Sequence, residues 1–192
     1  MRIGVLALQG AFAEHEAMLR GLGAEAVELR ELRDIEGIDG LVLPGGESTV
    51  QGKLLRELGM LGPLKARIEA GMPVLATCAG LILLASRLAN DPAVHFGTLP
   101  VTVRRNAYGR QLGSFETVAP FKGLGDFRMD FIRAPYVEEA DEGVETLAEV
   151  GGKTVAVRFG DQIGLAFHPE IGKDARIHAL FLDAVRKKAW RG

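Results

Sequence analysis

The single cysteine of the 192-residue chain, Cys78, lies where a strand-to-helix turn would present a nucleophile. Residues 74–77 are predicted to form a buried strand, and an apolar helical pattern at residues 79–88 begins directly after the cysteine. Such a turn is sharp and needs small neighbours, which Ala79 and Gly80 provide. The start of the helix favours the thiolate, and the backbone N–H of Ala79 is expected to bind an oxyanion. An isolated cysteine is usually a small buried apolar residue, so the assignment requires a base.

A base with an orienting acid follows the predicted strand at residues 163–167, in the sequence His168, Pro169, Glu170. The proline favours an extended backbone, in which residues two apart point the same way. Glu170 can therefore fix the tautomer of His168, and His168 can activate the thiol. Taken alone, the three residues are explained about as well by a surface turn. The other histidines lack this context and are predicted to be structural or surface residues: His15, His95 and His178.

A glycine-rich turn at residues 43–49, LPGGEST, follows another predicted strand. Gly45 and Gly46 allow positive φ angles and a close approach of backbone N–H groups to a ligand. Ser48 or Thr49 can cap the next helix. A plain strand-to-helix connection is the alternative. A Walker phosphate loop is not supported, because its Lys-Ser/Thr pair is missing.

The elements that must position these residues indicate an α/β fold. The first half alternates between strands and helices. Its strands are predicted at residues 2–8, 26–29, 40–43 and 74–77, and its helices at residues 12–22, 49–58, 63–70 and 79–88. The second half is mostly strands, at residues 98–104, 115–119, 130–132, 146–150, 154–159 and 163–167, before a helix at residues 174–190. We expect one domain with a mostly parallel central sheet, helices on its faces and an antiparallel extension.

The composition narrows the class of protein. Hydrophobic residues make up 47% and charged residues 25%, and the net charge is −2, so no basic footprint for nucleic acid is expected. No apolar stretch approaches the ~20 residues of a membrane helix, and the N-terminus is predicted to be a first strand and not a signal peptide. One cysteine excludes an internal disulfide and fits a cytoplasmic location. We expect neither a metal ion nor another cofactor.

Together these motifs resemble the class I, or triad, glutamine amidotransferases, and within them the branch that supplies ammonia to a pyridoxal 5′-phosphate synthase. The resemblance spans nearly the whole chain in family order, through GVLALQG at 4–10, LPGGEST at 43–49, TCAGL at 77–81, RNAYGRQ at 105–111, FIRAP at 131–135 and FHPE at 167–170. Cysteine followed by His-x-Glu is general to the class, whereas PGGEST, RNxxGRQ and IRAP are more specific to the branch. One departure is Ala76, where many class members have glycine; alanine is still small.

The resemblance implies a flavodoxin-like α/β fold and a role for each matching residue. The implied roles are a catalytic triad of Cys78, His168 and Glu170; a glutamine-binding and oxyanion turn at Gly46, Glu47 and Ser48; a substrate-binding Arg105; and a glutamine-contacting pair, Ile132 and Arg133. A guanidinium such as that of Arg105 can hold an α-carboxylate by a two-point contact, although an arginine in a loop is more often a surface charge.

The implied activity is hydrolysis of L-glutamine to L-glutamate and ammonia through a thioester on Cys78, without a cofactor. The implied partner is a separate synthase subunit that builds pyridoxal 5′-phosphate from a pentose phosphate and a triose phosphate in a hetero-oligomeric complex. Two other interpretations remain open. One is a stand-alone cysteine hydrolase, or a subunit of another amidotransferase, on the same fold. The other is a binding or regulatory module without turnover, against which the complete Cys-His-Glu set argues.

Overall fold

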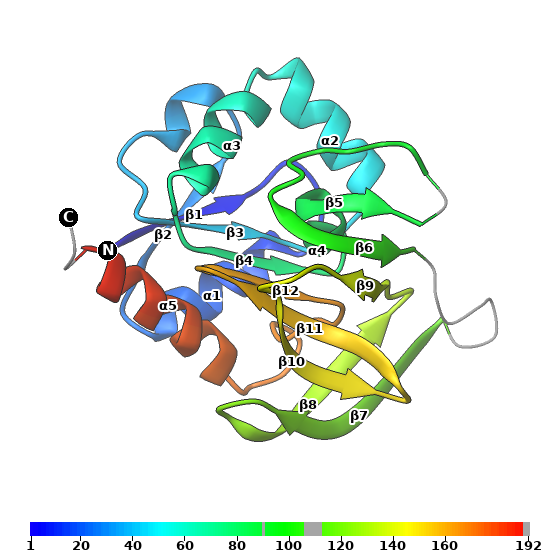
Figure 1. Ribbon diagram of the computed structural model, residues 1–192. Helices are drawn as coiled ribbons and strands as arrows, with labels where there is room; N and C mark the ends of the chain where they lie inside the picture. Colours follow the sequence, from blue (N-terminus) through cyan, green and yellow to red (C-terminus); the bar gives the residue numbers. More distant parts are fainter. Residues whose placement is uncertain (90, 106–112, 190–192) are drawn as a thin grey trace.

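A ten-stranded mixed sheet forms the centre of the molecule (Figure 1). The computed structural model describes residues 1–89, 91–105 and 113–189. Nine strands lie in the order β2 (Glu25–Leu29), β1 (Arg2–Leu6), β3 (Gly40–Leu43), β4 (Val74–Thr77), β12 (Gln162–Leu165), β11 (Lys153–Phe159), β9 (Tyr136–Ala140), β6 (Leu99–Arg104) and β5 (Ala85–Leu88). The tenth strand, β10 (Glu145–Val150), pairs with β11 outside this order.

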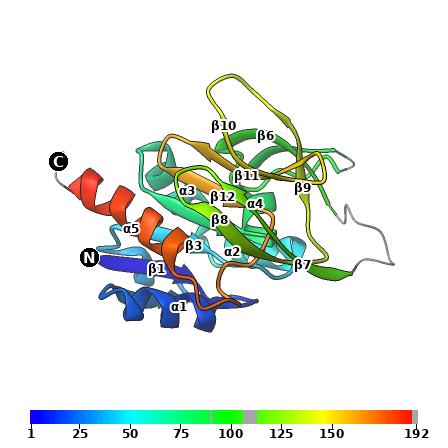
Figure 2. The same ribbon diagram turned by 90° about the horizontal axis from the view of Figure 1, so that it is seen from below.

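The first five strands in this order, β2, β1, β3, β4 and β12, are parallel to one another, as the alternation of strands and helices predicted. Helices α2 (Ser48–Glu57) and α3 (Leu61–Glu69) cover one face of this part, and α1 (Phe12–Gly21) and α5 (Arg176–Ala189) cover the other (Figures 1 and 2). Every residue of β3, β4 and β12 is buried, because helices cover both faces of a parallel sheet. The carboxyl ends of these strands meet at one edge, where Cys78 and the glycine-rich turn lie.

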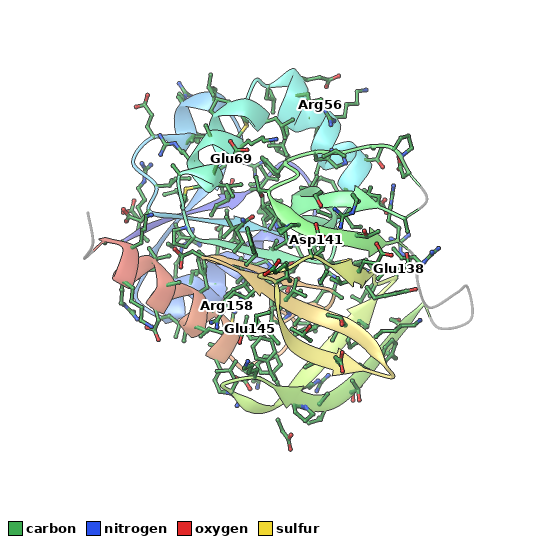
Figure 3. All side chains as sticks on the ribbon, in the orientation of Figure 1. Arg56, Glu69, Glu138, Asp141, Glu145 and Arg158 are labelled. Carbon is green, nitrogen blue, oxygen red and sulfur yellow. The ribbon has the colours of Figure 1, made fainter. Side chains whose placement is uncertain are left out.

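The second half adds the expected antiparallel extension. Strand β11 pairs antiparallel with β12 and β10, and β9 pairs antiparallel with β6. The turn between β10 and β11 is formed by Gly151 and Gly152, both at positive φ, as predicted. Arg158 of β11 and Glu145 of β10 face each other with 2.9 Å between Nε and Oε2 (Figure 3). Strands β7 (Ser114–Phe121) and β8 (Gly125–Ile132) form a separate hairpin. The predicted fold class is confirmed.

Local predictions differ from the structure in several places, and one is the strand predicted at residues 130–132, which is only the end of β8 (Gly125–Ile132). The helix expected at residues 79–88 ends early: α4 spans Ala79–Leu84, and Ala85–Leu88 form β5, parallel to β6. A continuous apolar run does not distinguish a buried helix from a buried strand, so pairing with β6 decides. Strand β9 was not predicted because only Val137 among its five residues is buried. A 3-10 turn at Leu32–Ile35 was also missed.

The last predicted helix, residues 174–190, corresponds to α5, and residue 190 lies outside the described residues. Within the described ranges, no helix has the length and apolar character needed to cross a membrane.

Candidate active site

Cys78 occupies a strained turn between β4 and α4. Its φ is +49° and its ψ is −101°, a backbone conformation that costs free energy for a non-glycine residue and that recurs at functional sites. The backbone N–H of Cys78 donates to the carbonyl of Leu165 at 2.8 Å, which ties the turn to β12. The thiol Sγ lies 3.8 Å from the carbonyl oxygen of Ile132. The predicted strand-to-helix elbow is therefore present, although its helix is shorter than expected.

His168 and Glu170 lie side by side behind the cysteine, as their spacing predicted. Nδ1 of His168 is 2.7 Å from Oε1 of Glu170, and both residues are buried. The backbone N–H of His168 donates to the carbonyl of Asp130 in β8 at 2.8 Å. Because Glu170 occupies Nδ1, the other ring nitrogen of His168 is the one available for proton exchange with the thiol.

The electrostatics of this pair favour an imidazolium beside a carboxylate. Burial lowers the pKa of His168, but hydrogen bonds with Cys78 and Glu170 and their charges outweigh it and raise that pKa to about 10. Burial raises the pKa of Glu170, but His15 and His168 outweigh it and hold that pKa below its usual value. At neutral pH, His168 therefore holds a proton that it can donate, and Glu170 is ionised.

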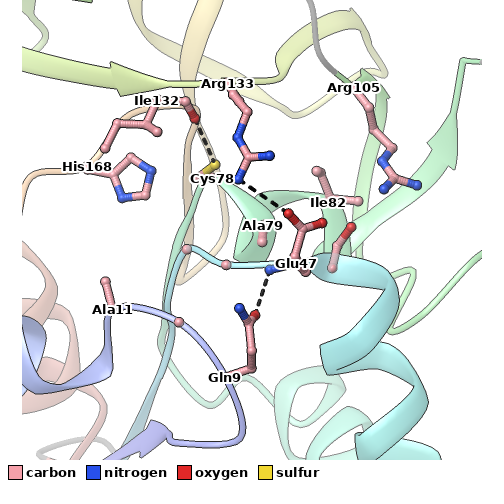
Figure 4. A pocket seen from close by; sticks show the side chains of 14 residues that line it. Gln9, Ala11, Glu47, Cys78, Ala79, Ile82, Arg105, Ile132, Arg133 and His168 are labelled. Atoms are coloured by element: carbon pink, nitrogen blue, oxygen red, sulfur yellow. Dashed lines mark hydrogen bonds and ion pairs between the residues drawn. The ribbon is translucent and has the colours of Figure 1, made fainter. Parts of the chain in front are cut away.

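A pocket of about 310 Å³ opens over Cys78 (Figure 4). Its volume is within the range of small-molecule sites. It brings together every site residue predicted from the sequence except Glu170, which lies behind His168. The predicted residues in its lining are Gly46, Glu47, Ser48, Cys78, Ala79, Arg105, Ile132, Arg133 and His168. The lining also includes Gly45 of the predicted glycine-rich turn, and four residues that were given no role from the sequence, namely Gln9, Gly10, Ala11 and Ile82.

Gln9 holds the glycine-rich turn in place. Its Oε1 accepts a hydrogen bond from the backbone N–H of Glu47 at 2.6 Å (Figure 4). Gln51 of α2 donates from Nε2 to the carbonyls of Gln9, at 2.8 Å, and Pro44, at 3.2 Å. A Cβ on Gly46 would lie 2.3 Å from Oε1 of Gln9, so this contact requires glycine. The signal in the sequence was a polar residue at the carboxyl end of the first buried strand, next to the turn.

The turn differs from one expectation. Neither Ser48 nor Thr49 caps α2: the cap position is Glu47, and no side chain makes the capping hydrogen bond. Thr49 instead faces Arg105, with 3.4 Å between Oγ1 and Nη2. Nη1 of Arg105 lies 3.2 Å from Oδ2 of Asp91. These two contacts orient the guanidinium beside the pocket. The rest of the RNAYGRQ motif, residues 106–111, lies outside the described residues.

Arg133 and Glu47 form an exposed ion pair at the pocket, with 3.4 Å between Nη2 and Oε1 (Figure 4). Arg133 has a φ of +43°, and its backbone N–H donates to the carbonyl of Gly113 at 2.5 Å. The preceding residue is Ile132, whose carbonyl faces the thiol. Both predicted residues of the IRAP motif therefore lie at the pocket. The backbone carbonyl of Ile132 faces the thiol, and the guanidinium of Arg133 pairs with Glu47.

The other histidines were predicted to be structural or surface residues, and the burial of two of them fits a structural role. His15 of α1 and His178 of α5 are fully buried and lie next to the triad. Burial lowers the pKa of both, that of His178 to about 3. Sequence could not show that α1 and α5 pack side by side behind Glu170. His95 is structural as expected, packed so closely on α2 that a Cβ on Gly52 would lie 2.0 Å from its Nδ1.

The comparisons with known proteins agree with this geometry. The model of the SNO glutamine amidotransferase family matches residues 5–187. "Pyridoxal 5′-phosphate synthase subunit PdxT" of Desulfitobacterium hafniense (strain Y51) is 63% identical over 186 residues, which cover 96% of this chain and 94% of that protein. The protein of the same name from Methanocorpusculum labreanum (strain ATCC 43576 / DSM 4855 / Z) is 54% identical over 187 residues, covering 96% and 98%.

A solved structure described as "Crystal structure of glutamine amidotransferase" has a TM-score of 0.92 and 45% sequence identity with this chain, and the match covers 95% of this chain and 98% of that one. The fold, the pocket over a strained cysteine and the family model all lead to the same result. The chain belongs to the SNO glutamine amidotransferase family.

Proposed function

We propose that this protein is the glutaminase subunit of a pyridoxal 5′-phosphate synthase. It hydrolyses L-glutamine to L-glutamate and ammonia, and the ammonia passes to a synthase subunit. The observation that carries the proposal is the placement of Cys78, in a strained turn beneath a pocket, in front of the buried His168–Glu170 pair. Nucleophile, base and orienting acid are the groups that acyl transfer from an amide requires.

In the acylation step, the thiolate of Cys78 attacks the carbon of the glutamine side-chain amide. The resulting oxyanion is bound by backbone N–H groups at Gly46 and Ala79, both of which line the pocket. When the tetrahedral intermediate collapses, the carbon–nitrogen bond breaks and the amine leaves with the proton of His168. This step leaves a γ-glutamyl thioester on Cys78, free ammonia and a neutral imidazole.

In the deacylation step, the neutral imidazole of His168 takes a proton from water as the water attacks the thioester. The carbon–sulfur bond breaks, glutamate is released and the thiolate–imidazolium pair returns. Glu170 remains ionised throughout, because its role is to stabilise the imidazolium and hold its tautomer.

The charges around the pocket fit free glutamine. Arg105 binds the α-carboxylate, and its contacts with Asp91 and Thr49 hold the guanidinium in place. Glu47, which also lines the pocket, supplies a negative charge for the α-ammonium group, and its ion-pair partner Arg133 and the neighbouring Ile132 complete the contact. The α-carboxylate and the α-ammonium group, both attached to the α-carbon of glutamine, thereby each meet a charge of opposite sign.

The partner follows from the chemistry of the product and from the relatives. Ammonia released into neutral water is protonated and is then no longer a nucleophile, so its consumer must be adjacent. The relatives at 54–63% identity are named as subunits of pyridoxal 5′-phosphate synthase. We assign the complex to the cytoplasm, where Cys78 stays a free thiol.

The test is a glutaminase assay with and without the synthase subunit that acts on a pentose phosphate and a triose phosphate. We expect glutamate release by the complex, none above background for Cys78→Ala in the complex, and weaker release by the subunit alone. With ammonium chloride in place of glutamine, the Cys78→Ala complex should still form pyridoxal 5′-phosphate, which shows that the partner is intact. Equal release with and without the synthase would favour a stand-alone hydrolase, and stimulation only by a different synthase would favour another amidotransferase.

A further inference from the structure

A buried chain of two histidines lies behind Glu170, on the side away from His168. His15 of α1 has Nε2 at 3.4 Å from Oε2 of Glu170 and at 3.2 Å from Oγ1 of Thr77. Its other ring nitrogen, Nδ1, is 2.9 Å from Nε2 of His178 in α5. Both imidazoles are fully buried. Each oxygen of Glu170 therefore faces a different histidine, Oε1 the triad histidine and Oε2 His15.

The charges of the neighbours decide which tautomer His15 adopts. A lone pair on Nε2 would face the ionised carboxylate of Glu170 and would be repelled, so Nε2 carries the proton. Nδ1 is then an acceptor and takes the N–H of His178. Burial is the largest influence on the pKa of both imidazoles and lowers it, so the two rings are neutral. The hydrogen bonds then run in one direction: His178 donates to His15, and His15 donates toward Thr77 and Glu170.

The far oxygen of Glu170 depends on this arrangement. In the described part of the chain, Oε2 has no partner with full hydrogen-bond geometry, so the polar N–H of His15 is the group that compensates for its burial. A metal ion does not explain the cluster, because no group of histidine, cysteine and acidic residues in the described ranges is arranged to hold one.

We propose that His15 is a positioning residue of the catalytic triad. Its neutral Nε2–H holds Oε2 of ionised Glu170, so that Oε1 stays directed at Nδ1 of His168, and His178 fixes the tautomer of His15. His15 does not touch the substrate and acts only through Glu170. The proposal rests on the glutaminase function proposed above.

The titratable groups that face His15 are His178 from α5, His168 and Glu170 from the segment after β12, and Glu14 from its own helix. Without the N–H of His15, the carboxylate of Glu170 is buried with less compensation, and it takes up a proton at higher pH. Protonated Glu170 no longer stabilises the imidazolium of His168. The acid limb of kcat against pH should therefore move to higher pH, while KM for glutamine stays the same.

The test compares two polar variants in the complex with the synthase. In His15→Gln, the amide nitrogen can reach the position of Nε2 and keep the donor to Glu170. In His15→Asn, the shorter side chain reaches only the position of Nδ1, so it keeps the contact with His178 and loses that donor. We expect the asparagine variant to lose about 10- to 100-fold in kcat, with KM within about 2-fold of the parent and the acid limb displaced. The glutamine variant should retain most of the kcat.

Leu19→Ala is the matched control, because Leu19 is a fully buried residue of the same helix whose role is apolar packing. It should lower the urea midpoint of unfolding without moving the acid limb. Equal kcat and equal pH profiles for the glutamine and asparagine variants would overturn the proposal, and so would an acid limb that moves in Leu19→Ala.

A second measurement separates this proposal from the proposed function. The pH dependence of Cys78 alkylation by iodoacetamide, followed by mass spectrometry of the subunit, reports the thiolate–imidazolium pair without any substrate. If the parent complex released no glutamate, the glutaminase function would be wrong, yet the alkylation profiles of the two variants would still have to differ. Identical alkylation profiles would overturn the role of His15 whatever the substrate is.

Discussion

Oε1 of Glu170 lies 2.7 Å from Nδ1 of His168, and both residues are buried. The pKa of His168 is raised to about 10. The pair is assembled from a tripeptide in which Pro169 separates the two side chains. A buried ion pair of this kind costs desolvation free energy, which is offset only when the geometry is good and further partners are present.

Replacing Glu170 by glutamine should keep the shape of the pair and remove its charge. The pKa of His168 should then fall from about 10, because burial lowers it and one of the opposing influences is gone. We expect kcat to fall by about 10²- to 10⁴-fold with little change in KM. The measurement is glutamate release by the complex over a range of pH.

Glu69→Gln is a suitable control for this substitution, since Glu69 is an exposed residue of α3 that pairs with Lys65 and lies outside the pocket lining (Figure 3). It should leave kcat unchanged. If Glu170→Gln kept the kcat of the parent, Glu170 would not be the residue that orients the triad histidine.

The buried histidines predict an acid-sensitive fold. The pKa of His178 is lowered from 6.5 to about 3 in the folded protein, so between these values the unfolded chain binds more protons. Stability should therefore decline as the pH falls from 6.5 toward about 3. Glu170, whose folded pKa is also lowered, adds to the loss of stability at the acid end.

Urea unfolding at a series of pH values checks this prediction. His178→Phe removes the titrating group and should make the free energy of unfolding less dependent on pH in that window, even though its absolute stability differs. A parent and a variant with the same slope against pH would show that His178 does not contribute to the acid sensitivity.

The sequence predicted the parallel half of the sheet because its strands are continuous apolar runs that end in distinctive turns. It also predicted the pocket residues, since Cys78, the LPGGEST turn and the HPE tripeptide all follow buried strands whose carboxyl ends must meet. It gave no role to Gln9, which lies three residues after the end of β1, because one polar side chain carries no signal of what it binds. It did not show that His15 and His178 lie beside Glu170, because helical spacing shows at most that a residue faces inward and not which neighbour it meets.

The close approach of the glycine-rich turn to the triad gives a further prediction. A Cβ on Gly45 would lie 2.3 Å from Cε1 of His168, a distance that the ring can relieve only by moving. Gly45→Ala should therefore displace the imidazole and lower kcat by about 10- to 100-fold, because displacements of about 1 Å have effects of that size. The matched control is Gly62→Ala in α3, where a Cβ meets no atom of the described residues within 4 Å beyond its chain neighbours and the backbone of its own helix.

Gly62→Ala should leave kcat unchanged, because Gly62 lies in α3, outside the pocket lining. Both variants should be compared in the same glutaminase assay and by urea unfolding. If Gly45→Ala kept the kcat of the parent, the position of the His168 imidazole next to Gly45 would not be required for catalysis.

Arg105 should control binding of glutamine more than the chemical step. Its guanidinium is held by Asp91 and Thr49 at the side of the pocket, and an ammonium group does not reproduce a planar two-point contact with a carboxylate. Arg105→Lys should therefore raise KM for glutamine by about 10-fold or more, since a charge-assisted hydrogen bond is lost, while kcat changes less. Asp91→Asn, which keeps the size of the side chain and removes its charge, should raise KM by a smaller factor.

Arg87→Lys is the matched control, because Arg87 of β5 forms a comparable two-point ion pair with Asp141. Both residues lie outside the pocket lining. The substitution should change neither KM nor kcat. The discriminating result is the split between the two constants. If Arg105→Lys lowered kcat and left KM unchanged, Arg105 would act on the transition state, and the α-carboxylate of glutamine would have to be bound elsewhere, with Arg133 as the next candidate because it also lines the pocket.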